Sequence, residues 1–276
     1  MSAFAKLSLL NHWASATITA TSTLSGYSAD NVKDATRPML PWRSNNVITD
    51  SDLRADHGSS KLVELVVFAN CNFATAHFQA HASNSWGAPT YASGAQTVAR
   101  NPWNDRYTHA IVPGSPPNLR WNRLFIPGQT PVDGAAYFEV GYVWAGAIVD
   151  IPDGLFEYGS IKLETVRPRK DTRSELGESL SRLRTGPPFT RLHASRMALS
   201  DDGALEGQLT VGELRDWADL ERRWWDAPSG AGAFYLNEGL SSEAWVMRML
   251  EQDPWALEEM PKSTSALTLE EFIAGV

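Results

Sequence analysis

The sequence predicts a mainly β protein in two parts, the second of which carries one α-helix. The chain of 276 residues is long enough for one large β domain or two ordinary ones. It contains 11 Trp, 16 Pro and 20 Gly, a composition typical of β-rich domains with many shaped loops. Alternating or β-branched patterns recur at residues 7–24, 61–69, 74–82, 118–127 and 135–146.

The strands of the first part differ in how deeply we expect them to be buried. Residues 61–69 are mostly apolar and β-branched, which indicates a central strand. Residues 74–82 alternate polar side chains with Ala and Phe, which indicates a half-buried strand. Residues 118–127 and 135–146 predict two more strands, and Asp133-Gly134 predicts a turn before the second.

Three segments between these strands are expected to be loops. Residues 27–44 have no regular period but hold Trp42, two prolines and several turn-forming polar residues. Such a stretch is typical of an ordered loop that an apolar side chain pins to a core. The acidic segment 45–60 and the segment 83–117, with its scattered aromatic residues, are also expected to be loops.

The composition changes near residues 150–154, which predicts a boundary between domains of residues 1–153 and 154–276. In the second domain Thr210 and Glu213 form a capping-box pattern, and apolar residues follow at helical spacing, so a helix is expected at about residues 211–226. Strands are expected at residues 189–199, 232–237, 244–249 and 266–269.

Charge, cysteine content and hydropathy exclude several classes of protein. The net charge of −8 and the pI near 5.3 argue against a nucleic-acid binder. The single cysteine, Cys71, excludes an intramolecular disulfide, and its apolar neighbours predict a buried, inert thiol. We expect neither a secretion leader nor a membrane span, because the sequence has no long apolar run.

The sequence contains only weak candidates for catalytic or metal-binding residues, so no enzyme activity, metal or cofactor is expected. The sequence has no Gly-x-Ser-x-Gly, no phosphate-binding loop and no His-Glu-x-x-His. Asp50, Asp52 and Asp56 lack the glycine and distal glutamate of a calcium loop, so a solvated acidic loop is favoured over a calcium site. On a strand, His77 and His81 would lie about 13 Å apart, too far to share one metal.

One motif in the first part resembles a known family. Asn31-Val32-Lys33-Asp34 leading to Trp42-Arg43-Ser44 resembles the loop of galactose-binding-like (discoidin-type) jelly rolls. Residues 119–124 and 138–146 resemble two later strands of that family, so the resemblance covers about residues 8–153. It implies a jelly-roll β-sandwich as the N-terminal domain.

This loop is also the first candidate ligand site. Asn31, Asp34, Trp42 and Arg43 could bind a carbohydrate, with the indole stacked on a sugar ring and the polar groups on its hydroxyls. Trp103 lies in a second candidate sugar-binding loop. The favoured alternative is that the Asn and Asp side chains brace the backbone while Trp42 plugs the sandwich.

A second resemblance concerns the C-terminal part. The predicted helix with Leu214, Trp217 and Leu220, followed by residues 233–236 and 245–248, resembles the distal-tail-type β-barrels of siphophage tail-tip proteins. This resemblance covers about residues 155–276 and implies a β-barrel-like domain. In many distal tail proteins the barrel is N-terminal, whereas here the jelly roll comes first.

The sequence also predicts where copies of the chain would meet. Arg167, Arg169, Lys170 and Arg173 are basic in an otherwise acidic protein, which favours either a solvated loop or an arm that docks on the acidic surface of a neighbouring copy. Adjacent tryptophans cannot share one helix face, so Trp225 is a candidate interface anchor.

Together, these features predict a structural protein of a phage tail tip or baseplate. It would form a ring with itself, a hexamer being favoured over a trimer, and would join the tail tube to tip proteins or fibres. Tape-measure, hub or fibre proteins would be its other partners, and the virion would be assembled in the host cytoplasm. The alternative is a carbohydrate-binding module that attaches to host glycans. A cell-wall glycan hydrolase is disfavoured, because no acid/base pair is evident.

Overall fold

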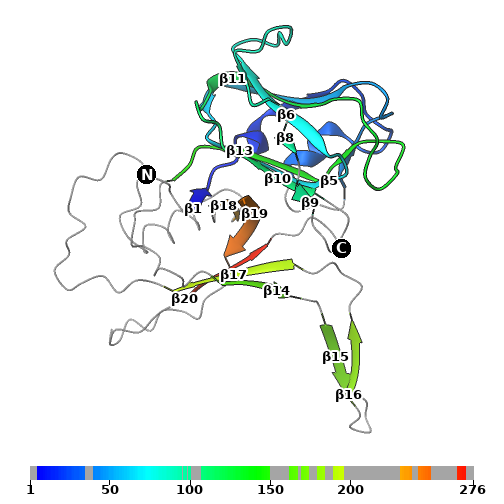
Figure 1. The fold of residues 1–276 in the computed structure, drawn as a ribbon, viewed down its shortest axis with the longest axis vertical. Coiled ribbons are helices and arrows are strands. Elements are labelled where there is room, and N and C mark those ends of the chain that lie inside the picture. The colour runs from blue at the N-terminus through cyan, green and yellow to red at the C-terminus, as the bar shows by residue number, and fades with distance from the viewer. Residues whose placement is uncertain are drawn as a thin grey trace, which may run out of the picture.

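A computed structural model of the protein describes residues 5–34, 40–94, 96–97, 99–100, 107–149, 162–166, 169–173, 179–183, 189–195, 231–237, 242–249 and 266–271. These residues form antiparallel strands and two short 3₁₀ helices, η1 (His12–Ser15) and η2 (Ala29–Lys33) (Figure 1). The mainly β fold class is therefore confirmed. The predicted helix at residues 211–226 lies outside the described residues.

Two sheets form a β-sandwich in the N-terminal part. The outer sheet consists of β2 (Thr17–Ala20), β4 (Ser51–Leu62), β11 (Asn118–Ile126), β6 (Thr75–His81) and β7 (Tyr91–Ala92), with β8 (Gln96–Thr97) also on β6. The middle sheet consists of β13 (Tyr142–Gly146), β5 (Leu65–Cys71), β10 (Tyr107–Ile111) and β9 (Ala99–Arg100). A short pair, β3 (Trp42–Arg43) and β12 (Glu139–Val140), lies beside them.

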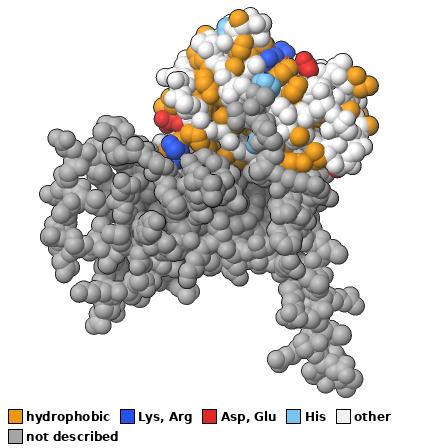
Figure 2. Space-filling view, in the orientation of Figure 1, with side chains coloured by type: hydrophobic (Ala, Val, Ile, Leu, Met, Phe, Trp, Pro, Cys, Tyr) orange, Lys and Arg blue, Asp and Glu red, His pale blue; other side chains and the backbone are white. Residues whose placement is uncertain are grey.

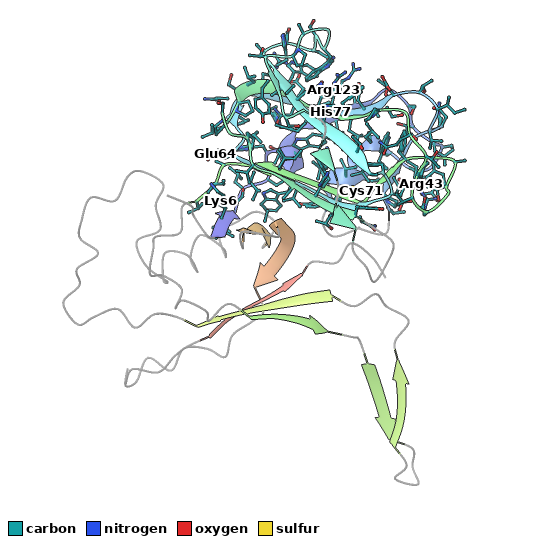
Figure 3. The ribbon with its side chains drawn as sticks, viewed as in Figure 1. Lys6, Arg43, Glu64, Cys71, His77 and Arg123 are labelled. Atoms are coloured by element: carbon teal, nitrogen blue, oxygen red, sulfur yellow. The ribbon has the colours of Figure 1, made fainter. Side chains whose placement is uncertain are left out.

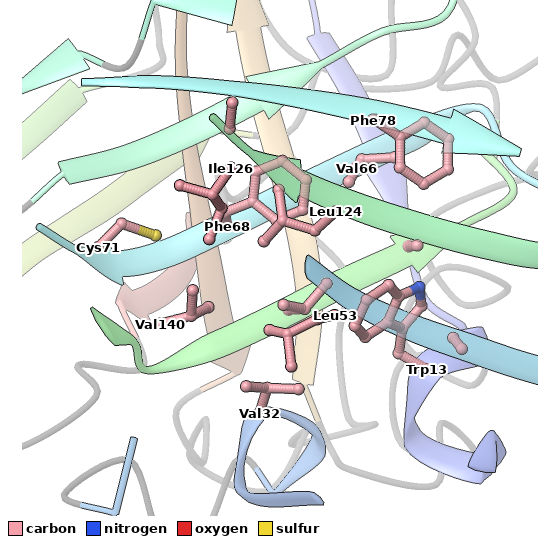
Figure 4. Close-up of a cluster of buried hydrophobic side chains, with 14 of the residues drawn as sticks. Trp13, Val32, Leu53, Val66, Phe68, Cys71, Phe78, Leu124, Ile126 and Val140 are labelled. Atoms are coloured by element: carbon pink, nitrogen blue, oxygen red, sulfur yellow. The ribbon is translucent and has the colours of Figure 1, made fainter. Parts of the chain in front are cut away.

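The sandwich core lies between the outer and middle sheets (Figure 4). Val66 and Phe68 of β5 face Leu124 of β11 and Leu53 of β4, and all four side chains are fully buried. Removing each such side chain from water stabilises the fold by about 1.5–3 kcal/mol. Cys71 lies in the same core, so its predicted burial is confirmed.

The middle sheet is buried on its other face as well. Leu65 and Val67 of β5, with Tyr142 and Trp144 of β13, form a second buried cluster that includes Ala233. Strand β19 (Ser242–Met249) packs against β5 and β10 on this side. This double burial explains why β5 is apolar at consecutive positions instead of alternating.

The third sheet joins the N-terminus to the C-terminal strands. Strand β1 (Ala5–Ser8) pairs with β18 (Ala231–Asn237), and Leu7 also bridges to Val149. The predicted boundary at residues 153 and 154 lies outside the described residues and stays a prediction. In order, the sheet contains β1, β18 (Ala231–Asn237), β19, β20 (Ala266–Glu271), β17 (Phe189–Ser195) and β14 (Lys162–Val166).

A two-stranded hairpin, β15 (Arg169–Arg173) with β16 (Ser179–Leu183), extends away from these sheets (Figure 1). The described strands β17, β18, β19 and β20 confirm the strands that the sequence predicts in these regions.

The prediction of a loop at residues 45–60 is wrong for its second half. Residues 51–62 form the twelve-residue strand β4, whose Leu53 and Ala55 side chains point into the core. The acidic residues that suggested a loop lie on the opposite face, where Arg54 and Arg123 pair with Asp52. The strand predicted at residues 61–69 accordingly starts later, at Leu65.

Two further boundaries differ from the sequence prediction. The described residues of the segment 83–117, expected to be a loop, form four strands, among them β10, where Tyr107, His109 and Ile111 alternate inward. The strand expected at residues 135–146 begins at Glu139 and is interrupted at Gly141. A Cβ atom at Gly141 would lie 2.7 Å from the Cβ atom of Asn70, so this close approach requires glycine. The strands predicted at residues 74–82 and 118–127 are confirmed.

We expect Gly146→Ala to destabilise the protein by about 1–3 kcal/mol, because overpacking a close contact forces backbone shifts. A Cβ atom at this position would overlap the carbonyl oxygen of Leu10. Gly114→Ala is the matched control, since nothing lies within 4 Å of its added Cβ atom. Urea unfolding of both variants measures the difference, and equal midpoints would contradict the close approach.

Candidate functional site

The loop that contains the first candidate sugar site is anchored by Trp42. The indole is fully buried, and its Nε1 donates to the Ser22 carbonyl oxygen at 3.1 Å and to Thr23 Oγ1 at 3.3 Å. Asn31 Nδ2 donates to the Pro41 carbonyl oxygen at 3.3 Å. In this structure Trp42 therefore offers no ring face to a sugar, and Asn31 braces the backbone of the loop.

Asn31 and Asp34 do come together, at a depression of about 420 Å³ beside η2. The other residues that line it are Ala14, Asp30 and Lys33. Lys33 is held in place by Asp30, at 2.6 Å, and by the Ala16 carbonyl oxygen. Among the described residues, no aromatic side chain lines this depression, so they offer no stacking surface of the kind that sugar recognition uses.

Arg43 lies at one end of the sandwich, away from Arg123 and His77 (Figure 3). Its guanidinium group packs between the rings of Tyr27 and Tyr137, 4.1 and 4.5 Å from their centres, and donates to Glu139 Oε2 at 2.7 Å. These contacts fasten β3 to β12. Among the other candidates, Trp103, Arg167 and Trp225 lie outside the described residues, whereas Arg169, Lys170 and Arg173 belong to β15.

The structure assembles a different cluster on the outer sheet, on the face opposite the core. Three side chains of β11 alternate there, and the register of the sheet places each of them between a residue of β4 and one of β6. The resulting cross-strand rows are Asp56–Trp121–His81, Arg54–Arg123–Gln79 and Asp52–Phe125–His77. We call this surface, together with Trp86, the outer face.

Arg123 organises the outer face. Its Nε and Nη2 donate to Gln79 Oε1 at 2.8 and 2.5 Å, and its Nη1 donates to Asp52 Oδ2 at 3.2 Å. The same guanidinium group lies 4.8 Å from the ring centres of both Trp86 and Phe125. Hydrogen bonds and cation–π contacts together hold the middle row in one arrangement.

Each arginine of the outer face pairs with a carboxylate, although two of the three share one. Arg54 Nη2 lies 2.8 Å from Asp52 Oδ2, so Asp52 is shared between Arg54 and Arg123. Arg120 makes two hydrogen bonds of 2.7 Å to Asp56. These hydrogen bonds lower the pKa of Asp56 to about 2. Asp56 is therefore ionised and paired, which makes it unsuitable as a catalytic acid.

The remaining side chains of the outer face give it both stacking surface and hydrogen-bonding groups. Trp86, Trp121 and Phe125 are each partly exposed. The ring of His77 stands edge-on to Phe125, with 5.5 Å between centres. Burial first, and then the charge of Arg123, lowers the pKa of His77, so its ring is neutral at pH 7 and can both donate and accept.

The sequence carries a pattern that corresponds to this site. Trp121, Arg123 and Phe125 alternate on one strand, and His77, Gln79 and His81 alternate on another. Both strands were predicted, but sequence alone did not show that β11 and β6 are neighbours. The pairing brings the two polar–aromatic faces together.

The histidines near the start of the sandwich bond to neighbouring polar groups. His57 Nε2 lies 2.8 Å from Asn122 Oδ1, and His12 Nε2 lies 3.1 Å from the Leu62 carbonyl oxygen. Burial, and then the nearby His57, lowers the pKa of His12 to about 4. Within the described part of the chain, no group of three or more His, Cys, Asp or Glu side chains could hold a metal ion.

Among the residues that the structure describes, no helix has the length and apolar character needed to cross a lipid bilayer.

Comparisons with known proteins find similar structures but no family. Neither a family model nor a curated protein matches the chain. The chitosan-binding module 1 of a chitosanase/glucanase from Paenibacillus sp. IK-5 is 20% identical, with a TM-score of 0.37, over 50% of this chain and 98% of that one. The lectin domain of lectinolysin, complexed with Lewis B antigen, is 10% identical with a TM-score of 0.38, over 49% and 94%.

A third similar structure has a different kind of partner. XRCC1, bound to the DNA polymerase β catalytic domain, is 12% identical with a TM-score of 0.38, over 47% of this chain and 93% of that one. Because these identities and TM-scores are low, the likeness gives this chain neither a family nor a function.

We expect Trp42→Ala to destabilise the protein by about 3–5 kcal/mol, because it leaves a cavity in the core and removes two hydrogen bonds. Ile48→Ala is the control, since Ile48 is 87% exposed and surface substitutions cost at most about 0.5 kcal/mol. Denaturant unfolding measures both. A Trp42→Ala protein of unchanged stability would show that Trp42 is not the anchor of the loop.

Proposed function

We propose that the protein binds carbohydrates through its outer face. The observation that carries this proposal is the placement of partly exposed aromatic rings beside planar polar side chains, in register, on three neighbouring strands. The face lies on the side of the sandwich away from the C-terminal sheet, as Arg123 and His77 show in Figure 3. A ligand can therefore reach it without displacing that sheet.

The chemistry of the face suits a sugar better than a charged partner. Sugars combine apolar C–H faces, which stack on Trp121 and Phe125, with hydroxyl groups, which bond to planar polar side chains such as Gln79. Because each arginine of this face already pairs with a carboxylate, a phosphate backbone would have to compete with these ion pairs. The described surface in view in Figure 2 is likewise mostly uncharged.

The proposed role is carbohydrate binding without catalysis. Asp52 and Asp56 are the carboxylates of the outer face, and arginines engage both of them. A glycosidase needs one carboxylic acid that keeps its proton near neutral pH and a second carboxylate across the scissile bond. The paired, ionised state of Asp56 does not meet the first need.

The test uses a glycan array, followed by calorimetry with the best glycan it finds. We expect Trp121→Ala and Phe125→Ala each to weaken binding by at least tenfold, which corresponds to about 1.4 kcal/mol, because each removes a stacking ring. Tyr27→Ala is the matched aromatic control at the end of the sandwich, where Tyr27 packs on Arg43. It should leave binding unchanged.

Two results would count against this function. One is a folded protein that binds no glycan at millimolar concentration. The other is a loss of binding in Tyr27→Ala but not in Trp121→Ala, which would move the site to the end of the sandwich. Circular dichroism of each variant establishes that its fold is intact.

A second proposal, assembly into a phage tail tip, is favoured by one feature, the basic hairpin of β15 and β16. Its register places Lys170 opposite Arg182. Like charges in directly opposed positions destabilise a strand pair, and an isolated hairpin is marginally stable in water. An acidic surface on a neighbouring copy would relieve both costs, and the net charge of −8 makes such a surface available.

In this second role the chain would form a ring in the virion tail tip, a hexamer being favoured over a trimer, after assembly in the host cytoplasm. The tail tube, tape-measure, hub or fibre proteins would be its neighbours, and Trp225 would anchor an interface. The outer face could then attach the particle to host glycans. The two proposals are therefore compatible, although they rest on different observations.

Light scattering after size exclusion tests the ring. We expect a mass several times that of one chain at low salt, and a shift to monomer when Arg169, Lys170 and Arg173 are all changed to Glu, because the reversed charges would repel an acidic neighbour. Lys61→Glu, on β4 of the sandwich, is the control and should keep the ring. A wild-type protein that stays monomeric at every concentration would refute this proposal.

A further inference from the structure

We infer that the outer face binds an extended stretch of an uncharged glycan chain, laid along β11, and not a single terminal sugar. This inference rests on the proposed function and adds the class of glycan and the way in which it is held. The geometry of β11, the preformed middle row and the charge balance of the face each support it.

The spacing along β11 sets the length of the ligand. Trp121 and Phe125 are four residues apart on one face of the strand, with Arg123 between them. At 3.3–3.4 Å per residue, their side chains start about 13 Å apart. A single pyranose ring is shorter than this distance and cannot stack on both. Simultaneous use of the two rings therefore requires a chain of about three sugars.

The middle of the face is already ordered for such a chain. Gln79 uses its side-chain oxygen for Arg123, which leaves its NH₂ group as a donor between the two aromatic rings. Asp52 holds the other side of Arg123. Because these side chains are fixed before the ligand arrives, little conformational entropy is lost when they bind a hydroxyl group.

The shape of the site also favours binding to the interior of a glycan chain over binding to its terminal sugar. A binder of terminal sugars typically encloses its ligand in a pocket. The outer face consists of rows of side chains across β4, β11 and β6, and Trp86 packs on Arg123 in the middle row. Because the rows follow one another along β11, a glycan stacked on Trp121 and Phe125 can continue beyond both rings.

Charge selects the class of glycan. Asp52 lies between Arg54 and Arg123, and Asp56 is bound by Arg120, so each of these ionic groups already has a partner of opposite charge. A cationic or acidic glycan would have to break one of these pairs, whereas a neutral one would not. A flat β-1,4-linked chain fits best, because its sugars present apolar faces on which Trp121 and Phe125 can stack.

The experiment is calorimetric titration of the whole protein with β-1,4-linked glucose oligomers of one to six sugars, and in parallel with oligomers of a β-1,4-linked uronic acid. We expect no measurable binding of the monosaccharide, at least a tenfold gain in affinity between two and four sugars, and a plateau beyond. Trp121→Ala and Phe125→Ala should each remove most of that gain. Tyr27→Ala should preserve it.

The outcomes separate this inference from the proposed function. If a glucose monomer binds as tightly as the tetramer, or if only the uronic acid series binds, the extended neutral chain is refuted while glycan binding stands. If neither series binds but the glycan array identifies another ligand, the β-1,4-linked class is refuted. If no glycan of any kind binds, the proposed function and this inference fail together.

Discussion

The burial of β5 on both faces is the constraint on which the rest of the structure depends. Val66 and Phe68 point into the sandwich core, while Leu65 and Val67 point into the cluster that includes Ala233 of β18. An apolar strand of this kind must be covered on both sides, because exposing either face to water would lose the free energy of its burial. The middle sheet is therefore internal, and the outer sheet keeps the accessible face of the sandwich.

Polar interactions then decide what the accessible face can do. Asp52 is almost fully buried, and a buried carboxylate is tolerated only when it is paired. Its partners, Arg54 and Arg123, are thereby held against the sheet, and Arg123 in turn packs on Trp86 and Phe125. The same contacts that pair a buried charge thus align aromatic and polar groups across three strands.

The N-terminal strand links the sandwich to the C-terminal sheet. β1 pairs with β18, and Trp144 of the middle sheet donates from its Nε1 to Ser8 Oγ at 3.0 Å. The Gly146 position allows the segment after β1 to pass close to β13. These contacts connect the sandwich to the sheet whose strands β14 and β17 precede and follow the basic hairpin in the chain.

The sequence by itself determined the strand content, because period-two patterns such as those at residues 74–82 and 118–127 record which side chains meet the core. It also indicated that Trp42 could be an anchor, since the indole lies between a proline and a strand. It could not reveal β4, whose acidic residues suggest a loop until Arg123, 71 positions after Asp52, is brought beside them. The outer face was likewise decided only by tertiary structure, because its rows are made by strand neighbours that no local pattern specifies.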